Sequence, residues 1–405
     1  IIVYGIVGTT SILGAQYWGK GDRKSLRFIF ALSLKLSVCV SLIFSVACIS
    51  VPRELMLIFT NEEELVRIGI GYLKIAGWSY FITGISQVYM VMMKVSEHAF
   101  LSALISTCTV IINILLNAVF IFGLFSLPPL GANGAALSTL ISRSIECAWC
   151  LIAFLGKDFV RVLPKDFMAK NKLLAKDFFA NLLPLVGASI FWGVGFTSYS
   201  AFMGHMGKDA AAANSVAAVV RDLVCCLCNG LATGAGIVVG SELGAGNLAK
   251  AKTYGNKLFL FAFILGFIST AIMLLLTPAV MNFVHLSKNA KHLLLGMMFI
   301  MSFYMIGRTI NTIVINGIFD CGGDTLFDVY SLAVFMWVLA ATLTCGFGMT
   351  LASCSNDDDP VTPQPSLAEA LVGEWIFEQF SEGLDVYGAD EETESLADGA
   401  TIAIL

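Results

Sequence analysis

Residues 230–247 read Gly230-Leu-Ala-Thr-Gly234-Ala-Gly236-Ile-Val-Val-Gly240-Ser-Glu-Leu-Gly244-Ala-Gly246-Asn247, and this stretch decides the fold. Gly236, Gly240 and Gly244 recur at every fourth position, as do Gly230 and Gly234. On a helix this spacing forms one smooth stripe, where the backbone of a neighbouring helix can come close. The pattern predicts a packing helix that stops at Leu243 and is followed by a turn at 244–247.

The first residues of the chain repeat this stretch at one constant offset. Gly5 corresponds to Gly230, Ile12-Leu13 to Ile237-Val238, and Gly19-Lys-Gly21-Asp22 to Gly244-Ala-Gly246-Asn247. A helix followed by the same exit turn is therefore used twice, which predicts two homologous halves. The packing and turn positions of the motif are Gly19, Gly21, Gly236, Gly240, Gly244 and Gly246.

The composition indicates a membrane protein, because 57% of the 405 residues are hydrophobic and only 13% are charged, against roughly a quarter charged in soluble domains. A bilayer-spanning helix needs about 20 apolar residues. Clear spans lie at 26–51, 68–93, 100–125 and 258–281, more polar ones at 131–155, 182–206, 211–243 and 293–318, and 1–17 resembles the later part of another. The predicted fold class is an all-α polytopic membrane protein.

The net charge of −5 combines two unlike parts of the chain. Residues 354–405 hold 13 of the 29 acidic residues and no Lys or Arg, whereas 13 of the 24 bases lie in loops at 20–27, 157–176 and 250–257. Basic loops between apolar spans mark the cytoplasmic side of a membrane protein. The bases therefore predict membrane topology and no nucleic-acid partner.

Two asparagines form the first candidate site. Asn113 and Asn117 are four residues apart, so both amides project from one face of the helix expected at 100–125. They could join neighbouring helices by hydrogen bonds, or they could line a polar cavity that holds a cation or a drug.

The ionisable residues inside the spans form the second candidate site. Each costs at least about 2.5 kcal/mol on insertion scales, so it is expected to face the interior with a partner. Arg221 and Asp222 are adjacent and point about 100° apart on a helix, so each is expected to find its own partner on a neighbouring helix. Asn214 shares roughly the face of Arg221, and Arg308 and Asn311 share a face of the span 293–318. The alternatives are a structural ion network and a site coupled to a cation or a proton.

No catalytic constellation and no metal site is predicted, and the chain is expected not to be an enzyme. Gly14–Lys20 fits GxxxxGK, but Gly21 stands where the phosphate-binding loop needs Ser or Thr. A pump built from this chain would therefore draw its energy from an ion gradient.

Four stretches of the sequence resemble motifs of the MATE (multidrug and toxic compound extrusion) family of transporters. They are Gly14–Asp22, its echo Val239–Asn247, Asn113…Asn117…Phe122-Gly123 followed by Gly131–Ser138, and Asn316–Thr325. The resemblance covers about residues 1–337. It implies two pseudo-symmetric six-helix lobes, with normally twelve helices and here about ten because both ends are truncated. The lobes are expected at 1–156, without its first helix, and at 177–337, truncated in the eleventh, with a cytoplasmic connector at 157–176.

The resemblance also implies a function. We expect a monomeric, multi-pass protein of the bacterial inner membrane that exports cationic or amphiphilic drugs and other toxic organic compounds in exchange for Na⁺ or H⁺. Its partners would be membrane lipid and small organic cations, and the coupling ion its only cofactor. The stretch Val186–Trp192 lacks the acid that relatives often have there, so coupling in this lobe would use Asp222. A related alternative is a flippase for lipid-linked sugars.

The end of the chain resembles a different kind of protein. Residues 338–353 have the length of a signal peptide and end in a bacterial lipobox, Leu351-Ala-Ser-Cys354, which makes Cys354 a lipidation site. The acidic residues that follow, within 354–405, resemble the N-terminus of a Bacteroides-type lipoprotein, and Leu371–Trp375 resembles a lipocalin-like first strand. We expect a short acidic tail, mostly disordered or β-like, joined artefactually to the transporter. A lipid-anchored binding protein is the remaining alternative function.

Overall fold

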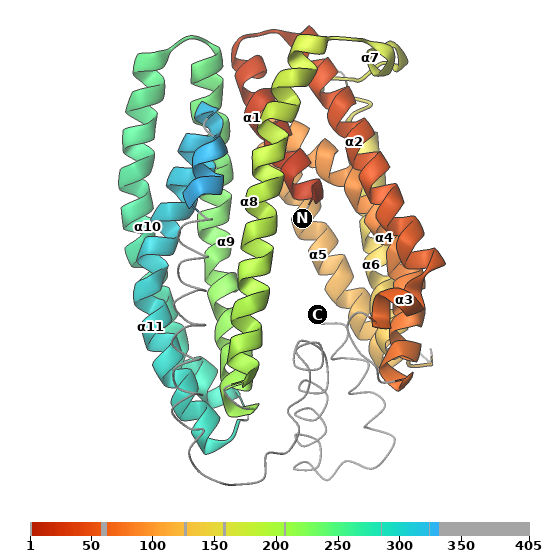
Figure 1. The fold of residues 1–405 in the computed structure, drawn as a ribbon, viewed down its shortest axis with the longest axis vertical. Coiled ribbons are helices and arrows are strands. Elements are labelled where there is room, and N and C mark those ends of the chain that lie inside the picture. The colour runs from red at the N-terminus through yellow and green to blue at the C-terminus, as the bar shows by residue number, and fades with distance from the viewer. Residues whose placement is uncertain are drawn as a thin grey trace, which may run out of the picture. The chain divides into compact units, whose positions relative to one another are not determined.

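The computed structural model describes residues 2–57, 63–124, 128–156, 159–205, 208–284, 286–323 and 325–331, and these contain helices and no strand. The helices are α1 (Ile2–Gly19), α2 (Arg23–Ser50), α3 (Pro52–Leu57), α4 (Glu63–Val95), α5 (Ala99–Phe122), α6 (Gly131–Ala153), α7 (Pro164–Met168), α8 (Lys172–His205), α9 (Lys208–Gly244), α10 (Leu248–Phe283) and α11 (Lys288–Thr312) (Figure 1). A π-helical turn η1 (Ile313–Phe319) and a 3-10 turn η2 (Asp320–Gly322) follow α11. The all-α prediction is confirmed.

Within the described residues, seven helices are long and apolar enough to cross a membrane. They are α2, α5, α6, α9 and α10, the first part of α8, and α11 with its η1–η2 extension. The predicted span 68–93 also forms a helix, α4, but it is not one of the seven. This helix is 33 residues long.

The chain divides into two compact units. Unit 1 contains α1, the first turn of α2 and the elements from α8 to η2. Unit 2 contains the rest of α2, from Arg27, and the elements up to α7. These units follow packing, whereas the predicted boundaries at 156 and 177 follow the long basic segment between them, interpreted as a connector. The lobe boundaries therefore stay predictions.

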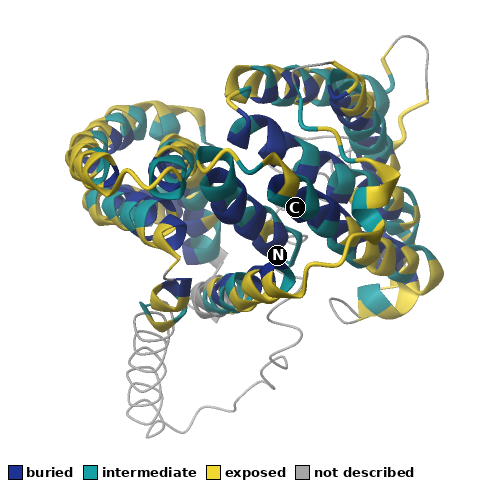
Figure 2. Ribbon diagram, turned by 90° about the horizontal axis from the view of Figure 1, so that it is seen from above, coloured by how far each residue is buried: buried dark blue, intermediate teal, exposed yellow. Residues whose placement is uncertain are grey.

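The core of unit 1 forms where α9, α10 and α11 pack against one another. On α9, Ala213, Ala217, Val220, Val224 and Cys228 follow helical spacing and are all buried. Met273 of α10 and Met298 and Met305 of α11 fill the space against this stripe and are fully buried. In Figure 2 the buried residues lie along the inner sides of the helices and the exposed residues along their outer sides.

The helix boundaries confirm the internal repeat. The second copy follows the first by 225 residues, since α1 ends at 19 and α9 at 244, α2 begins at 23 and α10 at 248, and α4 begins at 63 and α11 at 288. The two exit turns match in backbone geometry: Gly21 and Gly246 have φ of 75° and 78°, which favours glycine. Their amides donate to Trp18 and Leu243 carbonyls, both at 3.0 Å.

The two copies meet directly where α1 crosses α9 in unit 1. A Cβ added at Gly19 would lie 1.8 Å from the Ser241 carbonyl oxygen, and one added at Gly244 would lie 1.8 Å from the Gln16 carbonyl oxygen. Gln16 and Ser241 are themselves equivalent positions in the repeat. The crossing is therefore symmetric, because the glycine of each copy packs against the backbone of the other copy. Gly230 and Gly234 lie in open space, with no described residue within 4 Å of an added Cβ.

The two copies differ in how the next helix is capped. Asp22 Oδ1 accepts from the Ser25 backbone N–H at 3.1 Å, and its Oδ2 accepts from the Ser25 hydroxyl at 2.7 Å. The equivalent Asn247 makes no side-chain cap to α10 and donates to Glu242 Oε2 instead. The start of α2 is therefore capped by a carboxylate and the start of α10 is not.

Asp22→Ala is expected to reduce the stability of the folded chain by about 1 kcal/mol, the usual cost of an N-cap. The Ser25 hydroxyl, and then the Ser25 backbone N–H, lower the pKa of Asp22 below its ordinary value. The stabilisation is therefore complete above the ordinary Asp pKa of about 3.9 and is lost as the pH falls through the lower pKa of the folded state. Thermal unfolding in detergent at pH 7 and at progressively lower pH measures this, and Asn247→Ala is the matched control. An equal loss in both variants would contradict the capping difference.

Candidate functional site

Helix α9 presents three different faces. One is the buried apolar stripe described above. A second is exposed and apolar, with Val219 and Leu223 65% and 66% exposed, as expected for a surface that contacts lipid. The third, which we call the polar stripe, is exposed and consists of Ser215, Asp222, Cys226, Asn229 and Thr233. It lies on the side of the helix opposite the buried stripe.

Arg221 and Asp222 pair with each other, which the divergence of adjacent residues on a helix did not predict. Arg221 Nε donates to Asp222 Oδ1 at 2.9 Å, and Arg221 Nη2 lies 2.9 Å from the same oxygen. The two Cα–Cβ bonds diverge, but the long arginine side chain bends back to its neighbour. The arginine side chain is 12% exposed and the aspartate side chain 68% exposed, so the carboxylate faces out of the helix packing rather than into it.

The other predicted residues of unit 1 lie in different environments. Asn214 is buried on α9, and its Oδ1 has no hydrogen-bond partner among the described residues. On α11, Arg308 is half-buried. Asn311 is exposed. A role for these residues in a cation or substrate pathway stays a prediction.

In unit 2, Asn113 and Asn117 lie on one face of α5, as predicted. Asn117 Nδ2 donates to Asn113 Oδ1 at 3.2 Å, and Asn113 Nδ2 donates to Ser142 Oγ of α6 at 3.1 Å. Asn113 therefore joins two helices. Asn117 Oδ1 is buried and has no hydrogen-bond partner in the described part of the chain, so this oxygen remains available to a cation or a water molecule.

Sequence reasoning missed a buried ion pair beside these amides. Glu146 of α6 is 1% exposed. Its Oε1 accepts from Ser86 Oγ of α4 at 2.6 Å, and its Oε2 accepts from Arg143 Nη1 at 2.7 Å. The signal was present, because an acid and a base three residues apart inside a predicted span form a pair on one helix face. We call Ser86, Asn113, Asn117, Ser142, Arg143 and Glu146 the unit 2 polar cluster.

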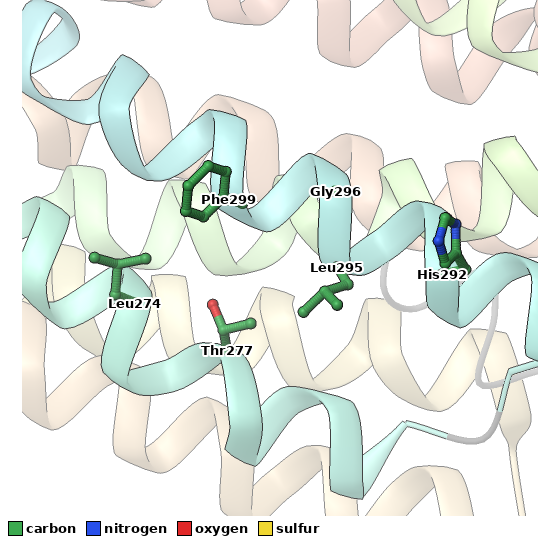
Figure 3. Close-up of a pocket in the computed structure, with 6 residues that line it drawn as sticks. All are labelled: Leu274, Thr277, His292, Leu295, Gly296 and Phe299. Carbon is green, nitrogen blue, oxygen red and sulfur yellow. The ribbon is translucent and has the colours of Figure 1, made fainter.

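A groove between α10 and α11 has a volume of about 390 Å³ and does not contain any predicted site residue. Its lining is apolar apart from Thr277 and His292, and Figure 3 shows Leu274 and Thr277 on one helix and Leu295 and Phe299 on the other. Its composition is that of a surface between two membrane-spanning helices.

The predicted lipidation site Cys354, the lipobox and the acidic segment 354–405 lie outside the described residues. Likewise, nothing in the structure describes the run 338–353.

Comparison with known proteins gives one family match, to the MatE family over residues 1–119 and 184–345. This match extends into the run 338–353, beyond the boundary at 337 expected from the sequence. The uncharacterised transporter YisQ of Bacillus subtilis is 23% identical and aligns over 87% of this chain and 77% of its own length. The probable multidrug resistance protein NorM of Rhizobium meliloti is 26% identical over 59% of this chain and 51% of its own length. The chain thus spans about half the length of this curated multidrug resistance relative.

Solved structures show the same fold. One is an outward-facing multidrug resistance MATE family transporter, with a TM-score of 0.72 and 20% identity over 82% of this chain and 73% of that one. Another is a crystal structure of MATE in the straight conformation, with a TM-score of 0.73 and 20% identity over 84% of this chain and 74% of that one. At this identity the likeness concerns the arrangement of the helices.

Proposed function

This chain belongs to the MatE family of transporters, and from that premise we propose that it exports cationic or amphiphilic organic compounds across the cytoplasmic membrane in exchange for Na⁺ or H⁺. Membership makes it a multi-pass membrane transporter rather than an enzyme. The direction of transport, the substrates, the coupling ion and the bacterial inner membrane as its location belong to the proposal.

The observation that supports transport is the polar stripe of α9. A membrane-spanning helix does not present a carboxylate and an amide to hydrocarbon, because each would lose its hydrogen bonds to water. Polar groups at membrane depth are tolerated where they line a water-filled cavity or are buried in protein. The stripe is exposed, so we infer that it borders an aqueous pathway, next to the apolar face of Val219 and Leu223 that suits lipid.

The substrate class follows from the chemistry of that stripe. Asp222 carries its negative charge on the outside of the helix, and Asn229 and Thr233 add oxygen acceptors within three turns. An organic cation with an apolar body would pair with the carboxylate and rest its apolar part on the neighbouring face. The comparisons do not favour the flippase or the lipid-anchored binding protein.

Cys226 provides a direct test, because it is a native, exposed cysteine within the polar stripe. In liposomes containing the full chain, we expect a charged methanethiosulfonate reagent to modify Cys226, since a thiol reacts as its thiolate, which needs water. Ethidium, an organic cation, should slow the modification. Peptide mapping by mass spectrometry gives the extent of labelling at each cysteine.

Cys39 of α2 is the matched control. It is also exposed, but it shares its helix face with Leu42, Ile43 and Val46, which are 48%, 67% and 52% exposed. This is a lipid-type surface, and Cys39 should remain unmodified. Equal labelling of both cysteines, or no protection of Cys226 by ethidium, would contradict the proposed pathway.

A further inference from the structure

The unit 2 polar cluster contains a carboxylate that the proposed function has not used. Glu146 lies inside α6, one of the seven helices suited to a membrane, and is 1% exposed. An ionised carboxylate at such a position needs a partner, because an unpaired charge buried in a protein is strongly destabilising. The identity and mobility of its partners therefore decide what Glu146 can do.

One partner of Glu146 is the charged side chain of Arg143, which can move away from the carboxylate. Arg143 donates through Nη1 to Glu146 Oε2 at 2.7 Å, and its side chain is 35% exposed. The two residues are one turn apart on the same helix, so the guanidinium can swing away without any movement of the backbone. A long, flexible and partly exposed arginine is a tethered cation that can be exchanged for a free one.

One neutral oxygen lies beside Glu146, and others follow along the hydrogen bonds that connect Ser142 of the same helix to α5. Ser86 Oγ lies 2.6 Å from Glu146 Oε1. Ser142 precedes Glu146 by one turn on the same helix face, and residues in this relation have Cβ atoms about 5–6 Å apart. Ser142 is bonded to Asn113, which is bonded to Asn117, whose buried Oδ1 lacks a donor in the described part of the chain. Hydroxyl, amide and carboxylate oxygens are the ligands that hard cations prefer.

The other titratable groups that the structure describes next to Glu146 do not compete for the positive charge. On α6 these are Cys147 and Cys150, and on α4 the group that faces these thiols is Tyr89. Thiols and phenols ordinarily titrate at about 8.5 and 10 and are neutral below that. The cluster residues from α5 are the amides Asn113 and Asn117, which do not titrate.

We propose that Glu146 is the carboxylate of unit 2 that takes the coupling cation, and that Arg143 is a tethered counter-ion that occupies it when the cation is absent. This inference rests on the proposed function for its physiological meaning. When Na⁺ or H⁺ arrives at Glu146, the guanidinium of Arg143 moves to its exposed side and the carboxylate stays neutralised. Because Na⁺ and H⁺ each carry one positive charge, either ion could neutralise Glu146 in this way. The experiment distinguishes which of the two ions binds.

The test measures cation binding to the purified full chain in detergent, independently of transport. Equilibrium binding of ²²Na⁺ at fixed pH measures Na⁺ binding. Proton uptake in weakly buffered solution without Na⁺ measures H⁺ binding. In Glu146→Gln we expect the binding found in the wild type to be lost, in whichever of the two assays it occurs. In Arg143→Gln we expect it to tighten several-fold, because removing a competing occupant raises the fraction of competent sites.

A structural role for the ion pair predicts a different pattern. The double variant Glu146→Gln with Arg143→Gln has no unpaired buried charge, so it should fold even where the single variants do not. If the pair is only structural, the double variant restores wild-type cation binding, whereas we expect it to remain unable to bind. Glu54→Gln, at an exposed acid of α3, is the control and should bind as the wild type does.

Restored binding in the double variant, or unchanged binding in Glu146→Gln, would overturn the inference. The two proposals fail separately. A wild type that binds a cation through Glu146 but exports no ethidium contradicts the proposed export, whereas gradient-driven ethidium export that survives in the double variant contradicts the role of Glu146.

Discussion

Gly244→Val is expected to remove most of the folded protein from the membrane. A Cβ at this position would lie 1.8 Å from the Gln16 carbonyl oxygen, and the atom in the way belongs to the backbone, which has no alternative rotamer. The two helices would have to separate at their crossing. Overpacking costs about 1–3 kcal/mol and occasionally more, and we place this substitution at or above the upper end of that range. The fraction of monodisperse protein after detergent extraction, together with its thermal midpoint, measures the effect.

Gly19→Val should be as damaging as Gly244→Val, because the added Cβ at Gly19 meets the Ser241 carbonyl oxygen at the same 1.8 Å. Gly230→Ala is the control on the same helix. Nothing described lies within 4 Å of its added Cβ, and alanine favours a helix over glycine by about 1 kcal/mol. This variant should therefore be at least as stable as the wild type. Tolerance of valine at either crossing position would show that the close contact is not needed.

Asp222→Asn is expected to reduce gradient-driven export of ethidium from liposomes by at least about tenfold, which corresponds to roughly 1.4 kcal/mol. The amide keeps the size of the side chain and can still accept a hydrogen bond from Arg221, but it loses the charge. Asp222 is the acid of the polar stripe and its side chain is 68% exposed. An organic cation passing along the stripe, or a coupling ion in unit 1, would pair with this carboxylate.

Two further variants distinguish an effect of the lost charge at Asp222 from an effect on the structure. Glu242→Gln removes an acid near the end of the same helix, where it accepts from Asn247, and it should export normally. The double variant Arg221→Gln with Asp222→Asn leaves no arginine without its carboxylate, so a continued loss of export assigns the effect to Asp222 itself. Full export by the Asp222→Asn variant would remove Asp222 from the mechanism.

The helices and the repeat could be predicted because both depend on local chemistry. Apolar runs of membrane length become helices wherever they pack, and Gly21 and Gly246 mark the same turn because both need a positive φ. The boundaries of α2, α5 and α6 consequently lie close to the predicted spans. Asn113 and Asn117 also follow from spacing alone, since residues four apart share a helix face.

The partners of the charged residues could not be predicted in the same way. The direction of a Cα–Cβ bond places a side chain on a helix face, but Arg221 is long enough to leave its face and reach Asp222. The Arg143–Glu146 pair was open to prediction from spacing, but its contact with Ser86 joins positions 60 residues apart. Such a contact depends on which faces of α4 and α6 meet, and no local pattern fixes that.

The symmetric crossing of α1 and α9 has the geometry of a contact in a two-fold homodimer, in which residue i of one subunit meets residue j of the other and j meets i. A single-copy ancestor would have needed two chains to make this contact, and one mutation would have altered it twice. Joined in one chain, each copy can change alone. Gln16 can differ from Ser241 and Asp22 from Asn247, while glycine stands at both positions where the backbones meet. In the repeated motif the crossing still constrains Gly19 and Gly244, and the exit turn still constrains Gly21 and Gly246.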